Sequence, residues 1–379
     1  MKCIDEVPSE YLKGVRVFLR TGLNLPLAED GSVGDIFRLR RGLPTVRYLV
    51  ERGARVIIAG YFGREGASMR PVAEALMRLA PDIQMHFLGS AFSEVPREAL
   101  SLKDGSCLIL ENLRRDPGEE KNDPNFAKLL ASSAELFVDD ALPEAHRPYA
   151  SNVGIAAHLP SYAGLLMRDE MAALSRSRAP EHPSFAILGG AKFETKAPLI
   201  ASLLSTYDHV FITGALANDV FKAQGLPVGR SLISKELPSP EILAHPGLLA
   251  PVDVTVQDPE GHARVKLPRD VIETDKIVDI GPDTIAHIAP FIGKAEHLLW
   301  NGPTGLYEEG FVSYTHAIAE LIAKRVDVGA TVVIGGGDTI AVLESCGIAK
   351  ERLGFLSTGG GAMLEYLLKG TLPAIEVLQ

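Results

Sequence analysis

The sequence predicts an α/β fold of two domains, each built on a parallel sheet, with a helix joining them. Short apolar runs alternate with amphipathic stretches along the whole chain, a pattern typical of parallel sheets covered by helices on both faces. The 379 residues exceed what one hydrophobic core usually holds. Near the middle of the chain, a helical stretch leads into a polar, proline-rich segment, which indicates a domain boundary.

Each predicted strand is a short, mainly apolar run bounded by polar residues, glycine or proline. In chain order these runs are Val15–Arg20, Arg55–Gly60, Ile83–Leu88, Cys107–Glu111, Leu136–Asp140, Phe185–Leu188, His209–Thr213, Val252–Val256, His297–Asn301, Thr331–Gly335 and Leu353–Ser357. Amphipathic spacing predicts helices between them, among them Leu39–Arg52, Arg70–Ala80 and Thr315–Arg325. Shorter helices are predicted after the last two strands, at Ile340–Ser345 and Ala362–Leu368.

The domain boundary falls near Gly164–Ser177, where the helical segment LLMRDEMAALSRS leads into SRAPEHPS. This predicts an N-terminal domain over residues 1–165, a connecting helix over 166–176 and a C-terminal domain over 177–365. The chain has no low-complexity tract and no short-period repeat that would suggest another architecture.

Composition and charge narrow the class of protein. A hydrophobic content of 46% and a charged content of 23% are typical of a globular enzyme, and a net charge of −10 argues against general nucleic-acid binding. Cys3, Cys107 and Cys346 are scattered without metal-ligand spacing, so a reduced, cytoplasmic protein is expected. No apolar run is long enough for a membrane span or a secretion signal, so neither is expected.

Two glycine runs near the C-terminus each close an apolar strand: IGGGDT at 334–339 and STGGG at 357–361. Tight turns are the plain alternative, but triple glycines ahead of a helix expose several backbone N–H groups to an anion. Ligands of open α/β sheets lie beyond the carboxyl ends of the strands. The two runs therefore predict a polyphosphate site. Asp338 is expected to cap the following helix, to bind a metal held by the phosphates, or to do both.

Other strand ends carry side chains suited to phosphate. In the second half, Lys192 and Lys196 follow a Gly-Gly strand end, and we favour phosphate contact for both over a solvated charged face. In WNGPTGLYEE, Asn301 with the loop amides is expected to face phosphate and Glu308 to bind ribose hydroxyls, although a proline turn is an equal alternative. The P-loop, dinucleotide and zinc-protease motifs are absent.

In the first half, the strand ends carry arginines instead of glycines. Single surface arginines mean little, but their recurrence at successive strand ends favours an anion site: Arg20, Arg64, Arg114 and, after the next strand, Arg147. His146 is more often a structural histidine than a catalyst, and no Ser-His-Asp or Cys-His spacing supports nucleophilic catalysis. An arginine-lined half and a glycine-lined half predict two anionic ligands brought together across a domain interface.

At this point the chain resembles the phosphoglycerate kinase family nearly from end to end. The matching motifs, in order, are LNLPL, DIFRLRRGLPTVRYLVERGARVI, FGR, PVAEAL, LILENLR, GEEKNDPNFAKLLAS, AHR, FAILGGAK, PVDV, DIGPDT, LWNGPTGLYE, IGGGDT and STGGGAMLEYL. The resemblance implies two Rossmann-like domains around a central cleft, with residues 366–379 packing back on the N-terminal domain. The N-terminal domain is expected to bind the phosphoglycerate and the C-terminal domain the Mg-nucleotide.

The resemblance also implies site residues and ligands. The acceptor site is expected to hold Asn24, Arg38, Arg64, Arg114 and Arg147, with Gly22 and Tyr61 beside them. The nucleotide site is expected to hold Lys196, Asn301, Glu308, Gly335, Gly336, Gly337, Asp338 and Thr339, with Mg²⁺ at Asp338. The expected catalytic set is Arg38, Lys192, Lys196, Gly336 and Gly360. ATP or ADP with Mg²⁺ and a small anionic carboxylate are the expected ligands; a monomer without nucleic-acid or membrane partners is expected.

The departures from the family pattern make this a divergent member, and they gather in the acceptor half. Gly22 replaces an aspartate that meets the acceptor hydroxyl in the family, and Tyr61 replaces a histidine at the acceptor phosphate. The family sequence NDAFG becomes Asp139-Asp140-Ala141-Leu142-Pro143. In the nucleotide half, Thr213 and Ala215 stand for two glycines.

Three hypotheses follow. The first is reversible phosphoryl transfer between Mg-ATP and 3-phosphoglycerate, giving 1,3-bisphosphoglycerate, a reaction that needs no general base because the acceptor carboxylate is already ionised. The second keeps the chemistry but changes the anionic carboxylate, since a lost polar contact can dominate selectivity. The third is a non-catalytic nucleotide-binding paralogue, which the retention of Arg38, Lys192, Lys196 and Asp338 disfavours.

Overall fold

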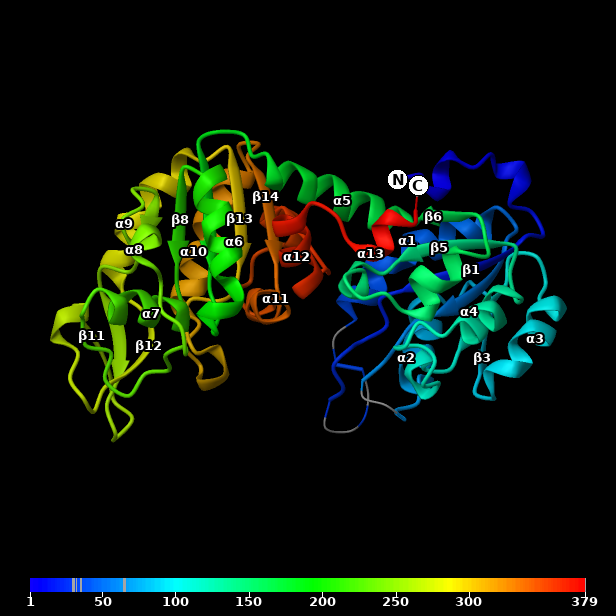
Figure 1. Cartoon of the computed structure of the whole chain (residues 1–379), viewed down its shortest axis with the longest axis horizontal. Helices are drawn as coiled ribbons and strands as arrows, with labels where there is room; N and C mark the ends of the chain where they lie inside the picture. Colours follow the sequence, from blue (N-terminus) through cyan, green and yellow to red (C-terminus); the bar gives the residue numbers. More distant parts are fainter. Residues whose placement is uncertain (29–30, 32, 35, 64–65, 379) are drawn as a thin grey trace. The chain divides into compact units, whose positions relative to one another are not determined.

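The structure is a computed structural model that describes every residue except 29–30, 32, 35, 64–65 and 379. The chain divides into two compact units (Figure 1). The first comprises Met1–Ala172 together with the chain from Thr371 onward, and the second comprises Ala173–Gly370. Helix α5, Leu165–Arg178, carries the boundary.

The first unit is built on a parallel sheet with the strand order β3-β4-β2-β1-β5-β6. Its strands are β1 (Arg16–Thr21), β2 (Arg55–Ala59), β3 (Met85–Leu88), β4 (Cys107–Leu110), β5 (Leu136–Asp140) and β6 (Ser161–Ala163). In the central strands, the register aligns Arg20 with Ala59 on one side and with Asp139 on the other. The end of β1 therefore lies beside the end of β5.

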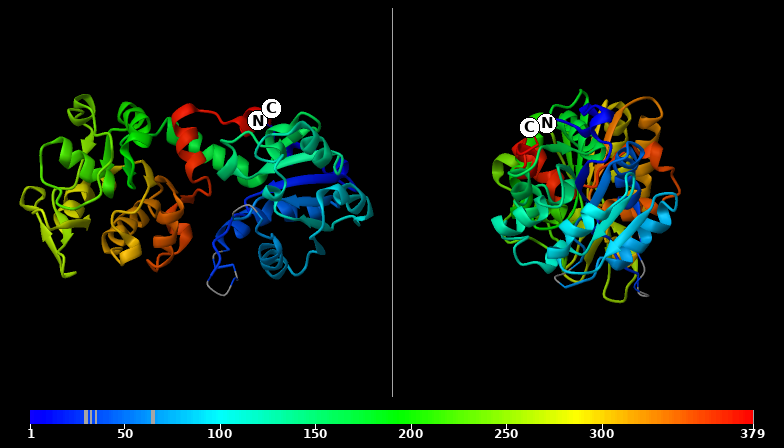
Figure 2. Two further views of the ribbon diagram at one scale, coloured as in Figure 1. Left: turned by 60° about the horizontal axis from the view of Figure 1, so that its bottom comes forward. Right: turned by 90° about the vertical axis from the view of Figure 1, so that its right-hand side faces the viewer.

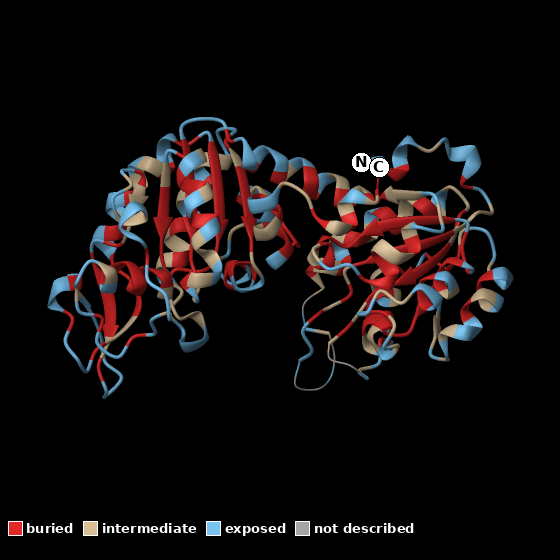
Figure 3. Ribbon diagram, viewed as in Figure 1, coloured by how far each residue is buried: buried red, intermediate tan, exposed pale blue. Residues whose placement is uncertain are grey.

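The second unit holds a parallel sheet with the order β15-β14-β13-β7-β8-β9. Its strands are β7 (Ser184–Leu188), β8 (His209–Ile212), β9 (Leu248–Leu249), β13 (His297–Asn301), β14 (Thr331–Gly335) and β15 (Phe355–Leu356). The central strands are buried, as Figure 3 shows, which explains their continuous apolar runs. The predicted α/β class with parallel sheets is confirmed.

One predicted strand lies outside the parallel sheets, where it was expected. The run at 252–256 forms β10 (Val254–Gln257) in a separate antiparallel sheet with β11 (Ala263–Lys266) and β12 (Lys276–Ile280). Strand β11 is mostly exposed and polar, so it lacks the apolar run that identifies a buried strand. Strands β6, β9 and β12 were also missed; β6 and β9 span only three and two residues.

Helices lie on both sides of the large sheet in each unit, as the further views in Figure 2 show. They are α1 (Phe37–Glu51), α2 (Arg70–Leu79), α3 (Val95–Ser101), α4 (Pro124–Ala131), α6 (Phe193–Thr206), α7 (Ala215–Ala223), α8 (Pro240–Leu243), α9 (Pro282–Lys294), α10 (Ser313–Val326), α11 (Gly337–Glu344), α12 (Gly361–Lys369) and α13 (Pro373–Glu376). The five helices predicted within the domains by residue range all form, with ends shifted by a few residues. Within the described residues, none of these helices combines the length and apolar character that crossing a bilayer requires.

Candidate functional site

The second unit gathers the glycine loops at one edge of its sheet. Strands β7, β13 and β14 are neighbours, and their register aligns Leu188, Asn301 and Gly335. The loops that follow these residues therefore leave the sheet side by side, at the carboxyl ends where α/β proteins bind ligands.

Close contacts hold the three loops together. The Gly189 N–H donates to the Asn301 carbonyl at 2.7 Å, and the Gly302 N–H donates to Thr339 Oγ1 at 2.8 Å. A Cβ on Gly302 would lie 2.7 Å from the Gly189 Cα, so only glycine permits this approach. Asn301 and Thr339, both predicted at the nucleotide site, thus contribute to the loop structure itself.

The two triple-glycine runs end at helix N-termini. Gly336 has a φ of 97° directly before α11, and Gly360 has a φ of 52° directly before α12. A Cβ on Gly336 would lie 3.0 Å from Asn301 Nδ2, whereas Gly337 and Gly360 face open space. The free N–H groups at the start of both helices suit an anion.

The two predicted lysines have different surroundings. Lys192 is exposed and lies just before α6 with left-handed backbone (φ 64°), so it stands outside the helix that carries Lys196. Lys196 lies on α6, is partly buried, and its Nζ donates to the Gly189 carbonyl at 2.6 Å. Burial lowers the pKa of Lys196, and the negative charge of Asp338 partly opposes that shift. Lys196 and Asp338 therefore act on each other electrostatically.

A cavity of about 280 Å³ adjoins these loops and has mainly apolar walls. Gly190, Ala215, Glu308 and Asp338 border it, which brings Glu308 and Asp338 to one cavity. Tyr307 also borders it and donates a hydrogen bond to Asp338 Oδ1 at 3.0 Å. The sequence prediction missed Tyr307, although it directly precedes Glu308 in the quoted motif.

A second missed residue on the cavity wall is Asp279. Asp279 is 4% exposed, and its carboxylate accepts a hydrogen bond from the Ile280 N–H at 2.8 Å. Burial raises the pKa of Asp279 to about 7. The motif DIGPDT contains this residue, but nothing in the motif indicated that the side chain of Asp279 faces a cavity.

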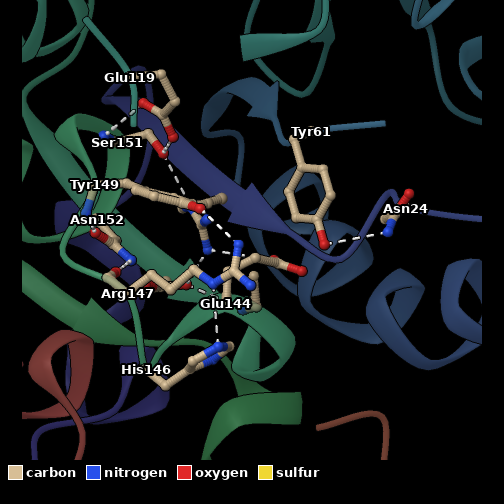
Figure 4. Close-up of polar contacts among 12 residues, drawn as sticks. Asn24, Tyr61, Glu119, Glu144, His146, Arg147, Tyr149, Ser151 and Asn152 are labelled. Atoms are coloured by element: carbon tan, nitrogen blue, oxygen red, sulfur yellow. Dashed lines mark hydrogen bonds and ion pairs between the residues drawn. The ribbon is translucent and has the colours of Figure 1, made fainter. Parts of the chain in front are cut away.

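In the first unit, several predicted acceptor residues lie around Tyr61. Asn24 Nδ2 donates to the Tyr61 hydroxyl at 3.1 Å (Figure 4), and Arg38 donates to the Asn24 carbonyl. The Arg114 guanidinium carbon lies 3.8 Å from the centroid of the Tyr61 ring. Four predicted residues, Asn24, Arg38, Tyr61 and Arg114, thus form one cluster.

Three other predicted acceptor residues are not part of this cluster as the structure describes it. Arg147 is exposed and donates to His146 Nε2 at 3.2 Å and to the Tyr149 hydroxyl at 3.0 Å (Figure 4). A Cβ on Gly22 would lie 3.9 Å from Pro143 Cγ, so there is room for a side chain at this position. Arg64 falls outside the described residues.

Arg20, which the sequence places among the ligand-facing arginines, is instead 1% exposed. Its guanidinium lies 3.8 Å from the Asp139 carboxylate and 3.7 Å from that of Glu144, and its Nε donates to Ser151 Oγ at 2.9 Å. Ser151 in turn donates to the buried Glu119 (Figure 4). Arg20 therefore neutralises buried carboxylates. These carboxylates are far from it in the chain, so the sequence pattern did not reveal the pairing.

We expect Asp139→Asn to stabilise the protein at neutral pH. Burial raises the pKa of Asp139 from 3.8 to about 6, with Arg20 opposing the shift. The folded state therefore holds this proton more tightly than the unfolded state, and stability is lost as the pH rises from about 4 to about 6. Two pKa units correspond to about 3 kcal/mol, so the variant should gain about 1–3 kcal/mol across that window.

Urea unfolding of both proteins between pH 4 and pH 8 measures this difference. The amide oxygen of the introduced asparagine can still accept the Ala141 N–H that Asp139 accepts at 3.0 Å. Asp104→Asn, at an exposed ion pair with Arg55, is the matched control and should change stability by less than about 1 kcal/mol. A gain that does not grow between pH 4 and pH 7 would show that Asp139 carries no such proton.

The chain is similar to one family along nearly its whole length. The family model described as phosphoglycerate kinase matches residues 5–370. The phosphoglycerate kinases of Chloroflexus aggregans and Thermus thermophilus are each 39% identical, over 97% of this chain and 96% and 97% of theirs. A Triticum aestivum protein named phosphoglycerate kinase, cytosolic, is also 39% identical over 97% of this chain and 96% of its own.

Solved structures agree with the sequence comparisons. The phosphoglycerate kinase of Pyrococcus horikoshii matches with a TM-score of 0.86 and 30% identity, over all of this chain and 98% of that one. The Coxiella burnetii structure matches with a TM-score of 0.80 and 34% identity, over 97% and 96% of the two chains.

Proposed function

The chain belongs to the phosphoglycerate kinase family, and we propose how its side chains carry out the reaction of that family. The reaction is the reversible transfer of a phosphoryl group between Mg-ATP and the carboxylate of 3-phosphoglycerate, a step of glycolysis and gluconeogenesis. Neither a changed acceptor nor loss of catalysis is favoured by the comparisons. The acceptor oxygen is already ionised, so the protein's task is to position two ligands and stabilise charge.

One observation supports the nucleotide assignment most directly. Strands β7, β13 and β14 end at the same edge of the sheet, where Leu188, Asn301 and Gly335 are aligned. We assign the phosphates to the N–H groups after Gly335–Gly337 and before α12, including Gly336 and Gly360, together with Lys192, Lys196 and Asn301. The base and ribose take the apolar cavity, with Glu308 on the ribose hydroxyls. No atom lies within 4 Å of the Cβ position at Gly337 or Gly360, so a phosphate has room to approach the backbone N–H groups there. This open space supports the assignment.

Mg²⁺ neutralises charge on the phosphates when it is bound, and Asp338 is its proposed protein ligand. Asp338 is exposed in the first turn of α11 and borders the cavity, which suits a cation shared with a bound nucleotide. Thr339 supports this turn through its contact with Gly302 rather than facing solvent.

We assign the acceptor to the cluster around Tyr61 in the first unit. Arg38 and Arg114 would bind its carboxylate and phosphate as charge-assisted hydrogen-bond donors, and Asn24 would bind beside them. Arg64 and Arg147 are proposed from the motifs alone. Because Arg147 is exposed, its guanidinium is accessible to an anion.

The direct test is a two-substrate assay with 3-phosphoglycerate, ATP and Mg²⁺, read through a coupled reduction of 1,3-bisphosphoglycerate. Turnover that depends on all three components is the expected result. A folded protein that binds nucleotide but shows no turnover would contradict the assignment, and turnover with another carboxylate alone would redefine the acceptor.

Tyr307→Phe tests the metal end of the nucleotide site. The Tyr307 hydroxyl stabilises the Asp338 carboxylate at 3.0 Å, so its removal should raise the KM for Mg-ATP about two- to tenfold with little change in kcat. Tyr366→Phe, which loses a hydrogen bond to Ser175 elsewhere in the unit, is the control. A lower KM in Tyr307→Phe would instead mean that Tyr307 competes with the ion for Asp338.

The remaining assignments concern the setting of the protein. We propose that the protein is a monomer and has no nucleic-acid partners. Light scattering of the purified chain tests the oligomeric state. A cytoplasmic location is supported by the Triticum aestivum relative named cytosolic. Fractionation of the source cells would check it.

A further inference from the structure

Asn218 is a buried polar residue in the wall of the apolar cavity of the second unit. It lies on α7 and is 3% exposed. Its Nδ2 donates to the Leu232 carbonyl at 3.0 Å, whereas its Oδ1 is buried and has no hydrogen-bond partner among the residues that the structure describes. No other described side chain on the cavity wall leaves a buried polar atom unpartnered in this way. A buried acceptor without a partner, in the wall of a cavity, suits a ligand that donates a hydrogen bond.

The orientation of the Asn218 amide is fixed by the loop that it holds. A carbonyl accepts only from the NH₂ end of an asparagine, so the contact with Leu232 identifies which end is the oxygen. The next residue, Asp219, anchors the same loop, because it accepts from the Ser234 N–H at 2.7 Å and from the Ser234 hydroxyl at 2.8 Å. Leu232 borders the cavity and is 64% exposed, so it offers apolar surface to a planar ring.

The place of Asn218 along α7 matches the base end of a nucleotide whose phosphates lie at the glycine loops. Helix α7 begins against the loop after β7, since the Leu216 N–H donates to the Gly190 carbonyl at 3.0 Å and a Cβ on Gly214 would lie 2.9 Å from the Gly190 nitrogen. Asn218 follows Gly214 by about one helical turn, or about 5 Å along the axis. Glu308, which we assign to the ribose, borders the same cavity as Asn218. The base of such a nucleotide therefore lies within reach of this asparagine.

Purine bases differ in the group that an acceptor can recognise. Adenine carries an amino group at its six-position, which donates, whereas guanine and hypoxanthine carry a keto oxygen there, which accepts. The Asn218 Oδ1 pairs with an amino group, but it meets a keto oxygen with no proton between the two acceptors. A site that leaves buried polar groups unpaired discriminates more strongly than one that loses an apolar contact, so this one oxygen can separate the two kinds of base.

We propose that Asn218 selects the base of the nucleotide, through a hydrogen bond from the six-amino group of adenine to its Oδ1. This inference rests on the proposed function and deepens it, because it names the base that the cavity takes and the contact that recognises it. The glycine loops and lysines contact phosphates, which are the same whatever the base, so they do not supply this selectivity.

The test compares Mg-ATP with Mg-ITP, whose base is hypoxanthine, by calorimetric Kd in the absence of acceptor and by kcat/KM with 3-phosphoglycerate. The unaltered chain should bind Mg-ATP about tenfold more tightly than Mg-ITP, the worth of one buried hydrogen bond. Asn218→Leu removes the acceptor at similar side-chain size and should bind the two nucleotides about equally. Asn218→Asp keeps an acceptor oxygen at this point and should retain the preference for Mg-ATP.

The variants also control for damage to the loop. Asn218→Asp loses the same contact with Leu232 as Asn218→Leu, so a preference kept only in Asn218→Asp belongs to the oxygen. Ser234→Ala removes a neighbouring anchor of the loop, the hydroxyl contact with Asp219, and should leave the preference unchanged. A loss of preference in Ser234→Ala as large as in Asn218→Leu would assign the selectivity to the loop and overturn the inference.

Two further results would overturn the inference and leave the proposed function intact. One is equal affinity of the unaltered chain for Mg-ATP and Mg-ITP, and the other is an undiminished preference in Asn218→Leu. The first measurement needs no variant, so it decides the matter even where Asn218→Leu fails to fold. Binding of neither nucleotide by the unaltered chain would contradict the proposed function itself and the inference with it.

Discussion

Replacing Lys196 with methionine is expected to lower kcat by about 10²–10³-fold, the usual loss when one preorganised donor to transition-state charge is removed. Lys196 is the partly buried lysine beside the glycine loops, and its Nζ already donates to the Gly189 carbonyl at 2.6 Å. Its lowered pKa reflects burial, which strengthens its interaction with a phosphoryl group in the same low-dielectric surroundings. The KM for ATP should change far less than kcat, because the loops and the cavity wall remain.

The measurement is steady-state kinetics with both substrates varied, beside circular dichroism to confirm folding. Lys222→Met, an exposed lysine in the last turn of α7, is the matched control and should keep full activity. A kcat within threefold of the unaltered chain would show that Lys196 does not stabilise the transferring group. A loss confined to KM would limit Lys196 to ground-state binding.

Replacing Arg20 with methionine is expected to destabilise the first unit by about 3–5 kcal/mol, the cost of leaving buried charges without their partner. Asp139, Glu144 and Glu119 would remain buried around the apolar side chain. A loss of this size is a large part of the stability of a typical domain. The loss should be smaller at pH 5 than at pH 8, because burial raises the pKa of Asp139, Glu144 and Glu119, so these carboxyl groups can take up protons as the pH falls.

Urea unfolding at the two pH values gives both numbers. Arg16→Met is the control on the same strand, where the ion pair with Glu135 at 3.2 Å is partly exposed and should be worth about 1 kcal/mol or less. Equal losses in the two variants would mean that burial does not set the value of the Arg20 contacts. A greater loss at pH 5 than at pH 8 would contradict the proposed protonation.

The glycine-lined sheet edge of the second unit, where we propose the nucleotide site, was largely predictable from the sequence. Its recognition depends on backbone geometry, and glycine runs after apolar strands announce that geometry locally. Asn301, Glu308, Gly336 and Asp338 all lie near one sheet edge or its cavity, as the strand-end rule predicts. Tyr307 and Asp279 lie within quoted motifs, but both were missed because a single aromatic or acidic residue has no periodic signal of its own.

The cluster around Tyr61, where we propose the acceptor site, was predictable only in part. The arginines were found by their recurrence at strand ends, but Arg20 was placed among the ligand-facing ones, whereas it is buried against carboxylates. The antiparallel sheet of β10, β11 and β12 was missed because two of its strands lack a long apolar run.

By itself, the sequence determined the class of fold, most of the central strands, the glycine loops and the family, because apolar periodicity and backbone freedom are properties of neighbouring residues. Only the tertiary structure decided which charges are buried, that Arg20 lies against buried carboxylates, and that Tyr61 lies against Asn24 and Arg114. These outcomes depend on residues far apart in the chain that the parallel sheet brings together. The energies of buried charges depend on such neighbours, so no local pattern encodes them.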